Sequence, residues 1–311
     1  MFSSKNSVQL SALSRQPPAN PPGPPFAKGG LGGFSYSVVW QHLMKCSLRL
    51  KWSLASWLIV LACIGMTACQ TVPITGRSQF LLLSEADEMQ MGIQSYREVV
   101  QKSKLSKDPV TNDLVKRVGT RIAAATGRTD FQWEFTVIED PQANAFALPG
   151  GKVAVYTGIL PITRDEAGLA AVLGHEVAHA VARHGAERMS QNLIVQMGLA
   201  GTMAALSNRD PQTVKTVSSL LGAGAAVGLV LPWSRGQESE ADHLGLIYMA
   251  KAGYNPSAAR DLWIRMAEAS RGQGRPPEFL STHPAEATRI QQIEAWLPEA
   301  SQHYRREPGT Q

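Results

Sequence analysis

Cysteine is scarce in this sequence and is confined to its first quarter. The three cysteines are Cys46, Cys63 and Cys69, and none follows in the rest of the sequence. A downstream domain without cysteine has no disulfides and no thiolate metal ligands. Any metal site in that part of the chain must therefore consist of histidine and carboxylate side chains.

Acidic residues are absent from residues 1–68, although this segment holds six of the 30 lysines and arginines. The rest of the chain has 24 basic and 25 acidic residues, so the net charge of +5 arises from the N-terminal segment. Downstream, no basic stretch of the sequence is interleaved with aromatic residues. We therefore expect no nucleic-acid partner.

Residues 1–43 are rich in proline and glycine, most of all between Pro17 and Gly33. Such a composition cannot bury enough apolar surface to fold, so we expect a disordered extension. Met44 offers a second candidate start of translation. The sequence leaves open whether translation begins at Met1 or at Met44.

The segment from Met44 has the order of a secretion signal. Three basic residues precede an apolar run at 52–65, and Met66-Thr67-Ala68-Cys69 follows. We expect a signal peptide at 44–68. It resembles a bacterial lipoprotein signal, which implies cleavage before Cys69, a lipid anchor on Cys69 and, with Gln70 next, the periplasmic face of the outer membrane. The alternative is a retained membrane anchor, for which the apolar run is short.

Downstream of the signal, the sequence predicts a tether at 69–83, one domain at 84–300 and a loose tail at 301–311. Helix-start residues and apolar spacing of three to four predict helices, whereas alternation of apolar and polar residues predicts strands. The expected helices are 84–100, 108–126, 165–181, 236–252, 256–270 and 285–296, and the expected strands are 131–137, 144–148 and 152–156.

Two further apolar stretches, 193–206 and 217–231, are separated by a turn at 207–211. Both are shorter than a comfortable membrane span, which needs about 20 residues. We expect a helical hairpin packed over the active site, with membrane insertion as the alternative.

The motif His175-Glu176-Val177-Ala178-His179 lies in the expected helix 165–181. Residues four apart lie on one helix face, so His175 and His179 can bind one metal ion together. Glu176 lies beside them and can act as a general base on water, as in zinc peptidases. The alternative is a chance spacing of polar residues on an ordinary helix.

A catalytic zinc needs a third protein ligand. His184 is one candidate, but it is off register for the longer pattern in which a third histidine falls six residues after the second. Glu238 and Asp242 share a helix face, and one of them can bind the metal while the other orients a ligand histidine. We expect Glu240 to point into solvent. An ordinary charged helix face is the alternative for the whole cluster.

The strand at 144–148 precedes the motif helix in the chain. At the edge of a sheet, such a strand can pair with an extended substrate peptide. The candidate substrate contacts are Asn144, Ala145 and Phe146. A purely structural edge is the alternative.

Four motifs in this order resemble the HtpX-like zinc metallopeptidases, family forty-eight of the metallopeptidases, which also includes the CAAX prenyl endopeptidases. They are Asn144 to Gly151, the histidine motif, the E-x-x-A-D of 238–242, and Ser281-Thr282-His283-Pro284. The resemblance covers about residues 75–300 and is greatest to the periplasmic lipoproteins of the BepA and LoiP type. It implies an α+β, mainly helical, gluzincin-type domain with a small β-sheet beside the motif helix.

The resemblance also implies roles for individual residues. His175, His179 and Glu238 would bind one Zn²⁺ per chain, Glu176 would activate water, and Asp242 would orient a ligand. His283 would steady the tetrahedral intermediate or fill the open metal position in a resting state, with a plain loop histidine as the alternative.

The function implied is an endopeptidase that degrades unfolded or misassembled proteins of the cell envelope. One alternative is a non-catalytic, chaperone-like or assembly lipoprotein that binds outer-membrane proteins. The other is a structural lipoprotein without metal.

Overall fold

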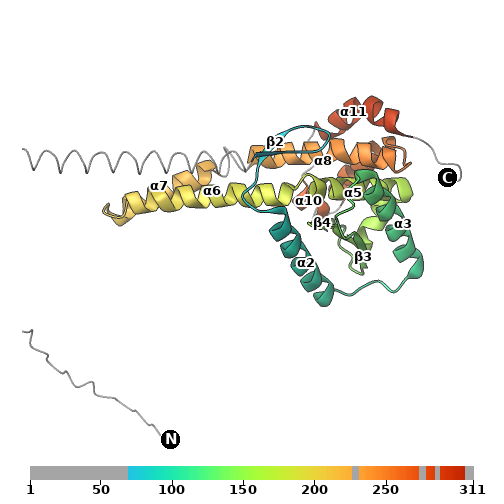
Figure 1. The fold of residues 1–311 in the computed structure, drawn as a ribbon, viewed down its shortest axis with the longest axis horizontal. Coiled ribbons are helices and arrows are strands. Elements are labelled where there is room, and N and C mark those ends of the chain that lie inside the picture. The colour runs from blue at the N-terminus through green and yellow to red at the C-terminus, as the bar shows by residue number, and fades with distance from the viewer. Residues whose placement is uncertain (1–68, 226–230, 273–277, 284–287, 305–311) are drawn as a thin grey trace, which may run out of the picture. The chain divides into compact units, whose positions relative to one another are not determined.

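The computed structural model describes residues 69–225, 231–272, 278–283 and 288–304. The extension expected at 1–43 and the signal expected at 44–68 lie outside the described residues. Within them the chain is mainly helical, with one three-stranded and one two-stranded sheet (Figure 1). The expected α+β class is confirmed.

The described helices are α2 (Glu85–Lys102), α3 (Pro109–Thr126), α4 (Leu160–Thr163), α5 (Glu166–Val181), α6 (His184–Ala205), α7 (Pro211–Ala225), α8 (Leu231–Lys251), α9 (Ser257–Gly272), α10 (Glu278–Thr282) and α11 (Arg289–His303). The described strands are β1 (Cys69–Thr71), β2 (Ser78–Phe80), β3 (Glu134–Ile138), β4 (Ala145–Leu148) and β5 (Lys152–Tyr156), and a 3-10 turn, η1 (Thr157–Ile159), links β5 to α4.

The first two helices begin and end where local sequence signals place them. Ser84 caps α2 by accepting a hydrogen bond from the backbone N–H of Asp87, and Asp108 caps α3 by accepting from the N–H of Val110 and Thr111. Gly127 ends α3 in the left-handed region, at φ 73°. Both expected helices are confirmed, since caps are encoded within a few residues of the helix itself.

The three-stranded sheet has the order β3-β5-β4, with β3 parallel and β4 antiparallel to β5. The strands expected at 144–148 and 152–156 are confirmed as β4 and β5, which form a hairpin whose turn places Gly150 and Gly151 at positive φ. Strand β3 begins three residues later than expected, and Phe131 and Trp133 instead pack on each other with ring centroids 5.2 Å apart. Among the described strands, β4 forms an edge of this sheet, and it packs against α5.

Helices α5 and α8 form the centre of the domain and cross at two glycines. A β-carbon on Gly174 would lie 2.9 Å from the carbonyl oxygen of Gly245, and one on Gly245 would lie 2.9 Å from the amide nitrogen of His175. Any residue larger than glycine would push the two backbones apart. The close crossing sets the histidine face of α5 directly against α8.

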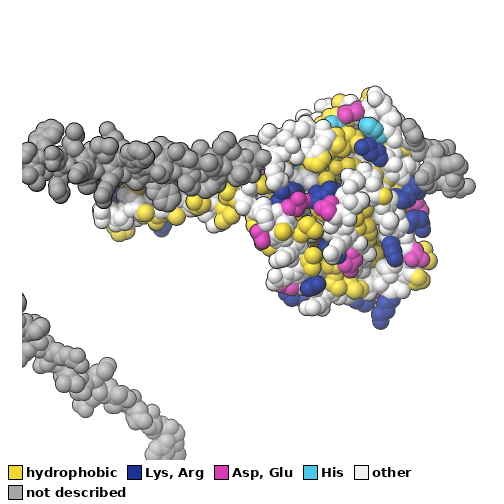
Figure 2. All heavy atoms as spheres, viewed as in Figure 1, with side chains coloured by type: hydrophobic (Ala, Val, Ile, Leu, Met, Phe, Trp, Pro, Cys, Tyr) yellow, Lys and Arg dark blue, Asp and Glu magenta, His cyan; other side chains and the backbone are white. Residues whose placement is uncertain are grey.

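Helices α6 and α7 form the expected helical hairpin and pack on each other. The hairpin extends away from α5 and the sheet (Figure 1), so the prediction that it packs over the site is wrong. Hydrophobic side chains are visible along it in Figure 2. Its exposed large hydrophobic residues include Leu193, Ile194, Met197, Met203 and Leu220. Among the described residues, no helix is both long enough and apolar enough to cross a membrane.

The segment expected to be a tether is instead an ordered hairpin. Strand β1 pairs with β2 in antiparallel register, and Val72 is buried at the turn between them. Two residues in the turn, Ile74 and Gly76, have positive φ. The polar composition is typical of a linker, but contacts to distant helices order the segment, as described below.

At the C-terminal end, the helix expected at 285–296 is α11, which begins at Arg289 and continues to His303. Pro298 lies inside the helix and does not end it. Because Ile293 and Ala300 are buried and the helix packs on α8 and α9, tertiary contacts outweigh the local effect of the proline.

Candidate metal centre

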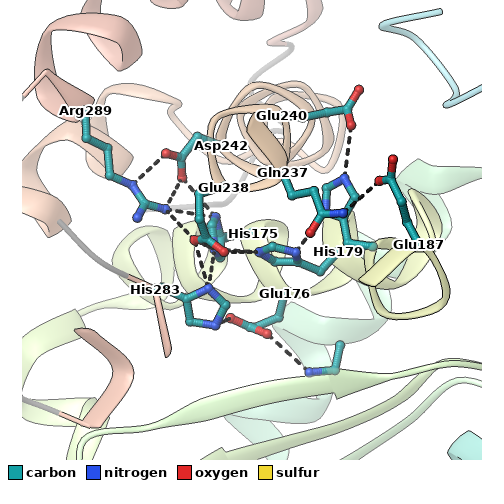
Figure 3. A network of polar contacts seen from close by, with 12 residues as sticks. His175, Glu176, His179, Glu187, Gln237, Glu238, Glu240, Asp242, His283 and Arg289 are labelled. Carbon is teal, nitrogen blue, oxygen red and sulfur yellow. Dashed lines mark hydrogen bonds and ion pairs between the residues drawn. The ribbon is translucent and has the colours of Figure 1, made fainter. Parts of the chain in front are cut away.

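The two motif histidines lie one turn apart on the face of α5 that meets α8. Both side chains are buried, and their Nε2 atoms face each other at 3.1 Å (Figure 3). The rings of Trp263 and Phe279 lie edge-on to His175, each with its centroid 6.0 Å away. Two buried imidazole nitrogens that converge on one point are suited to a shared cation, because neutral histidine is a common zinc ligand.

Glu238 reaches the same point from α8. Its two carboxylate oxygens lie 3.4 Å from the Nε2 atoms of His175 and His179. Oxygen Oε1 is buried and has no hydrogen-bond partner among the described residues. A buried carboxylate oxygen without a partner is costly, and a metal ion bound between the imidazoles would satisfy it.

His283 completes a group of four. It follows α10, and its Nδ1 lies 2.9 Å from Oε2 of Glu238 and 3.2 Å from Nε2 of His175. One donor atom from each of His175, His179, Glu238 and His283 lies within 4.8 Å of the others. Three imidazoles and one carboxylate are a donor set that suits zinc.

The pKa values of the two motif histidines shift in opposite directions. Burial lowers the pKa of His179 well below its ordinary value, which keeps the ring neutral. Burial also acts to lower the pKa of His175, but hydrogen bonds with Asp242 and Glu238 outweigh it and raise the pKa to about 9. Metal binding at His175 must therefore displace a proton.

Glu176 lies beside the group and is itself buried. Its Oε2 accepts a hydrogen bond of 3.2 Å from the backbone N–H of Ala147 in β4, and its Oε1 lies 3.3 Å from Nε2 of His283. Burial raises the pKa of this carboxyl, and the nearby charges of His283 and His175 counteract part of the effect. A carboxylate with a raised pKa is a stronger base than an exposed one, as general-base catalysis requires.

Asp242 supports His175 from behind. Its Oδ1 lies 2.9 Å from Nδ1 of His175, and Arg289 of α11 binds both of its oxygens, at 2.6 and 2.7 Å. Burial opposes ionisation of Asp242, but Arg289 and His175 outweigh it and lower its pKa. Since an ionised carboxylate only accepts hydrogen bonds, His175 must donate through Nδ1, which leaves its Nε2 lone pair available for a metal.

Sequence reasoning missed Arg289. Its guanidinium is buried, lies 3.4 Å from the centroid of the Trp263 ring and is 3.6 Å from Glu238. A basic residue shortly after His283, at the start of the last helix, was the available signal. It could not be interpreted without knowing that α11 packs against α8.

The expectation that Glu240 is solvated is wrong. Only 7% of the residue is exposed, and its Oε2 lies 3.0 Å from Nε2 of His184. His184 is fully buried behind His179, with the Nδ1 atoms of the two rings 2.8 Å apart. Burial opposes ionisation of Glu240, but hydrogen bonds from His184, Thr75 and Arg77 lower its pKa to about 2. The Glu240 side chain points away from Glu238 as expected, but it contacts His184, Thr75 and Arg77 and not solvent.

The three residues expected to contact substrate lie at or beside β4. The backbone oxygen of Asn144 accepts from the N–H of Tyr156, so Ala145 and Ala147 direct their backbone groups away from β5. Ala145 is buried, whereas Phe146 is partly buried and packs on the Tyr156 ring at 6.2 Å. The lipidation candidate, Cys69, is the first residue of β1.

Similarity to known proteins extends over most of the chain. The profile of peptidase family M48 matches residues 109–297. Mitochondrial metalloendopeptidase OMA1 of Schizosaccharomyces pombe is 43% identical over 239 residues, which cover 75% of this chain and 68% of the relative. OMA1 of Saccharomyces cerevisiae is 33% identical over 256 residues, covering 76% and 72%. The beta-barrel assembly-enhancing protease of Escherichia coli K12 is 28% identical over 252 residues, covering 78% of this chain and 51% of the relative.

Proposed function

Since the chain belongs to peptidase family M48 and is a metalloendopeptidase, we propose that it uses one zinc ion held by His175, His179 and Glu238. The observation that carries this proposal is the carboxylate of Glu238. It is buried, and its Oε1 lies 3.4 Å from Nε2 of His179 without a hydrogen-bond partner among the described residues. A bound cation removes that cost.

The catalytic base is Glu176. A zinc ion, when bound, supplies a Lewis acid that polarises the scissile carbonyl and lowers the pKa of water to near 7. Glu176 takes a proton from the attacking water and returns it to the leaving amine. The N–H of Ala147 fixes one carboxylate oxygen and leaves the other for this transfer.

His283 lies next to the proposed zinc ligands and the proposed base, and we propose two roles for it. It contacts Glu238, His175 and Glu176 and so lies among the proposed ligands and beside the proposed base. We infer that His283 would fill the open metal position in a resting state. When it moves aside for substrate, a ring N–H of His283 can donate to the oxyanion of the tetrahedral intermediate.

The substrate is an extended, unfolded polypeptide. Strand β4 directs the backbone carbonyl groups of Ala145 and Ala147 away from β5, and an added peptide strand can donate to them. The N–H groups of these two residues already donate to Asn144 and to Glu176. Such pairing needs several residues in extended conformation, so a misfolded or misassembled protein is a better substrate than a compact native one. Phe146, on the same strand, and Asn144, directly before it, border this edge.

The site of action is the cell envelope. Residues 44–68 have the order of a secretion signal, and Cys69 is the lipidation candidate. One class of relatives is named for enhancing β-barrel assembly. We infer a lipid anchor on Cys69 and misassembled envelope proteins as substrates, at the periplasmic face of the outer membrane.

The decisive variant is Glu176→Gln. It should keep one zinc per chain by metal analysis and lose cleavage of an unfolded substrate such as casein. Full activity in this variant would contradict the assignment of Glu176. If the wild-type protein binds unfolded chains but shows no cleavage that a chelator abolishes, the protein is a binding lipoprotein and not an active peptidase.

A further inference from the structure

We propose that Glu240 and His184 fix the tautomer of His179, and that Arg77 from the N-terminal hairpin holds this pair in place. The inference rests on the proposed role of His179 as a zinc ligand. It assigns a positioning role to three residues that do not belong to the four-residue metal cluster.

Glu240, His184 and His179 form a series of hydrogen bonds, and the directions follow from the Glu240 carboxylate, which can only accept. The Glu240 carboxylate lies 3.0 Å from Nε2 of His184, so His184 carries its proton on Nε2. The Nδ1 atom of neutral His184 is then an acceptor. It lies 2.8 Å from Nδ1 of His179, so His179 must donate through Nδ1. The Nε2 lone pair of His179 is left facing His175 and Glu238.

This direction matters because a neutral histidine has two tautomers. With the proton on Nε2, His179 would present an N–H to the cluster and could not bind a cation there. For His175, the Asp242 carboxylate fixes the same tautomer directly, by accepting a hydrogen bond from Nδ1. Among the described residues, the contact at Nδ1 of His179 is the His184 ring and not a carboxylate, and this ring transmits the effect of Glu240 to His179.

The carboxylate of Glu240 is in turn held by the turn between β1 and β2. The Nε of Arg77 donates to Oε2 of Glu240 at 2.8 Å, and the hydroxyl of Thr75 donates to Oε1. The Nη atoms of Arg77 bind both oxygens of Glu187 at 2.7 and 2.8 Å. The guanidinium of Arg77 thus links Glu187 of α6 to Glu240 of α8. Its planar group of donors is suited to binding two carboxylates at once.

The β1–β2 hairpin therefore supports the metal centre through the contacts of Thr75 and Arg77 with Glu240. Arg77 lies eight residues after Cys69 in the chain, and its side chain is 35% exposed. Loss of its contacts leaves Glu240 free to turn toward solvent, and His184 then loses the acceptor that fixes its tautomer. We expect weaker zinc binding without a loss of fold.

The first test compares two arginine variants in the full-length protein. Zinc affinity is measured by competition with a chromophoric chelator. Arg77→Ala should weaken zinc binding measurably, but by less than the roughly 10- to 100-fold that follows removal of a partner in contact with a metal ligand, because Arg77 acts through Glu240 and His184. The matched control is Arg128→Ala, which also removes an arginine that binds two carboxylates, Glu85 and Asp130, neither of which belongs to the metal cluster or to the residues proposed to position it. The control should bind zinc like the wild type.

The second test separates hydrogen bonding from shape at position 184. Gln has both a donor and an acceptor and can replace the relay, whereas Phe fills the ring volume without either. His184→Phe should lose about 10- to 100-fold in zinc affinity, and His184→Gln should recover most of that loss. The visible spectrum of the Co²⁺-substituted protein should change for Phe more than for Gln, because the ligand field reports the orientation of His179.

Each outcome has one meaning. Equal zinc affinity in Arg77→Ala and Arg128→Ala, or equal loss in His184→Gln and His184→Phe, would overturn the inference and leave the zinc site intact. If circular dichroism shows that His184→Phe does not fold, the arginine pair and His184→Gln decide. A wild-type protein that binds no zinc would overturn both the proposed function and the inference.

Discussion

The close crossing of α5 and α8 requires glycine at position 245, and adding one methyl group there tests this requirement. In Gly245→Ala, the new β-carbon would lie 2.9 Å from the amide nitrogen of His175 and 3.0 Å from the carbonyl carbon of Gly174. Both are backbone atoms and cannot rotate aside. The two helices must therefore move apart, and the ligand residues move with them.

A matched control lies on the same helix. Gly236 is also within α8, but no described atom would lie within 4 Å of a β-carbon there. Gly236→Ala should stabilise the protein by about 1 kcal/mol, because alanine loses less backbone entropy than glycine in a helix. In Gly245→Ala the same gain is opposed by about 1–3 kcal/mol of overpacking. The two variants should thus differ by about 1–3 kcal/mol in the free energy of unfolding.

Urea unfolding of the metal-free proteins measures this difference, and chelator competition measures zinc affinity. Zinc ligands must keep their positions within about 0.2 Å, so the displacement of α8 in Gly245→Ala should also weaken zinc binding. Gly236→Ala should bind zinc normally. The reasoning is refuted if Gly245→Ala gains as much stability as Gly236→Ala and keeps wild-type zinc affinity.

Three further predictions concern side chains and one backbone group around the site. Asp242→Asn should weaken zinc binding about 10- to 100-fold in chelator competition, since it removes the carboxylate that fixes the tautomer of His175; unchanged affinity would contradict that role. The pKa of Glu240 is lowered from 4.5 to about 2, so its contribution to stability is present above pH 4.5 and is lost as the pH falls toward 2. The stability difference between wild type and Glu240→Gln, about 3 kcal/mol at neutral pH, should therefore shrink below pH 4.5 in urea titrations, and a constant difference would argue against the shift. Ala147→Pro removes the N–H that binds Glu176 without removing a bond to β5, and should lower kcat/KM for an unfolded substrate roughly 10- to 100-fold at normal zinc content; wild-type kinetics would show that this N–H does not position the base.

What the sequence predicts well depends on short-range signals. The caps at Ser84 and Asp108 and the turn at Gly150 each need only a few residues, and the structure has them as expected. The pair His175 and His179 is likewise set by helical spacing alone. Glu238 could be proposed because it shares a helix face with Asp242, although helical spacing does not tell which of the two carboxylates lies nearer the metal.

What the sequence does not predict depends on contacts between distant segments. Glu240 looks solvated because its partners, Thr75 and Arg77, come from a stretch with the composition of a linker. Arg289 gains meaning only when α11 packs against α8 and places it on Asp242. The direction of the α6–α7 hairpin was predicted wrongly for the same reason. Apolar composition indicates a pair of helices but does not tell against which surface the pair lies.

The hairpin also bears on how this scaffold can vary. It stands in the chain between His179 on α5 and Glu238 on α8, yet it extends away from both (Figure 1). The entropy of closing a connection grows only logarithmically, and each doubling of its length adds about 0.6 kcal/mol. Inserts of different length or chemistry at the tip, around residues 207–210, would therefore leave the two ligand-bearing helices in register. The tip is thus a permissive position for evolutionary or engineered tailoring, and the crossing at Gly174 and Gly245 is a restrictive one.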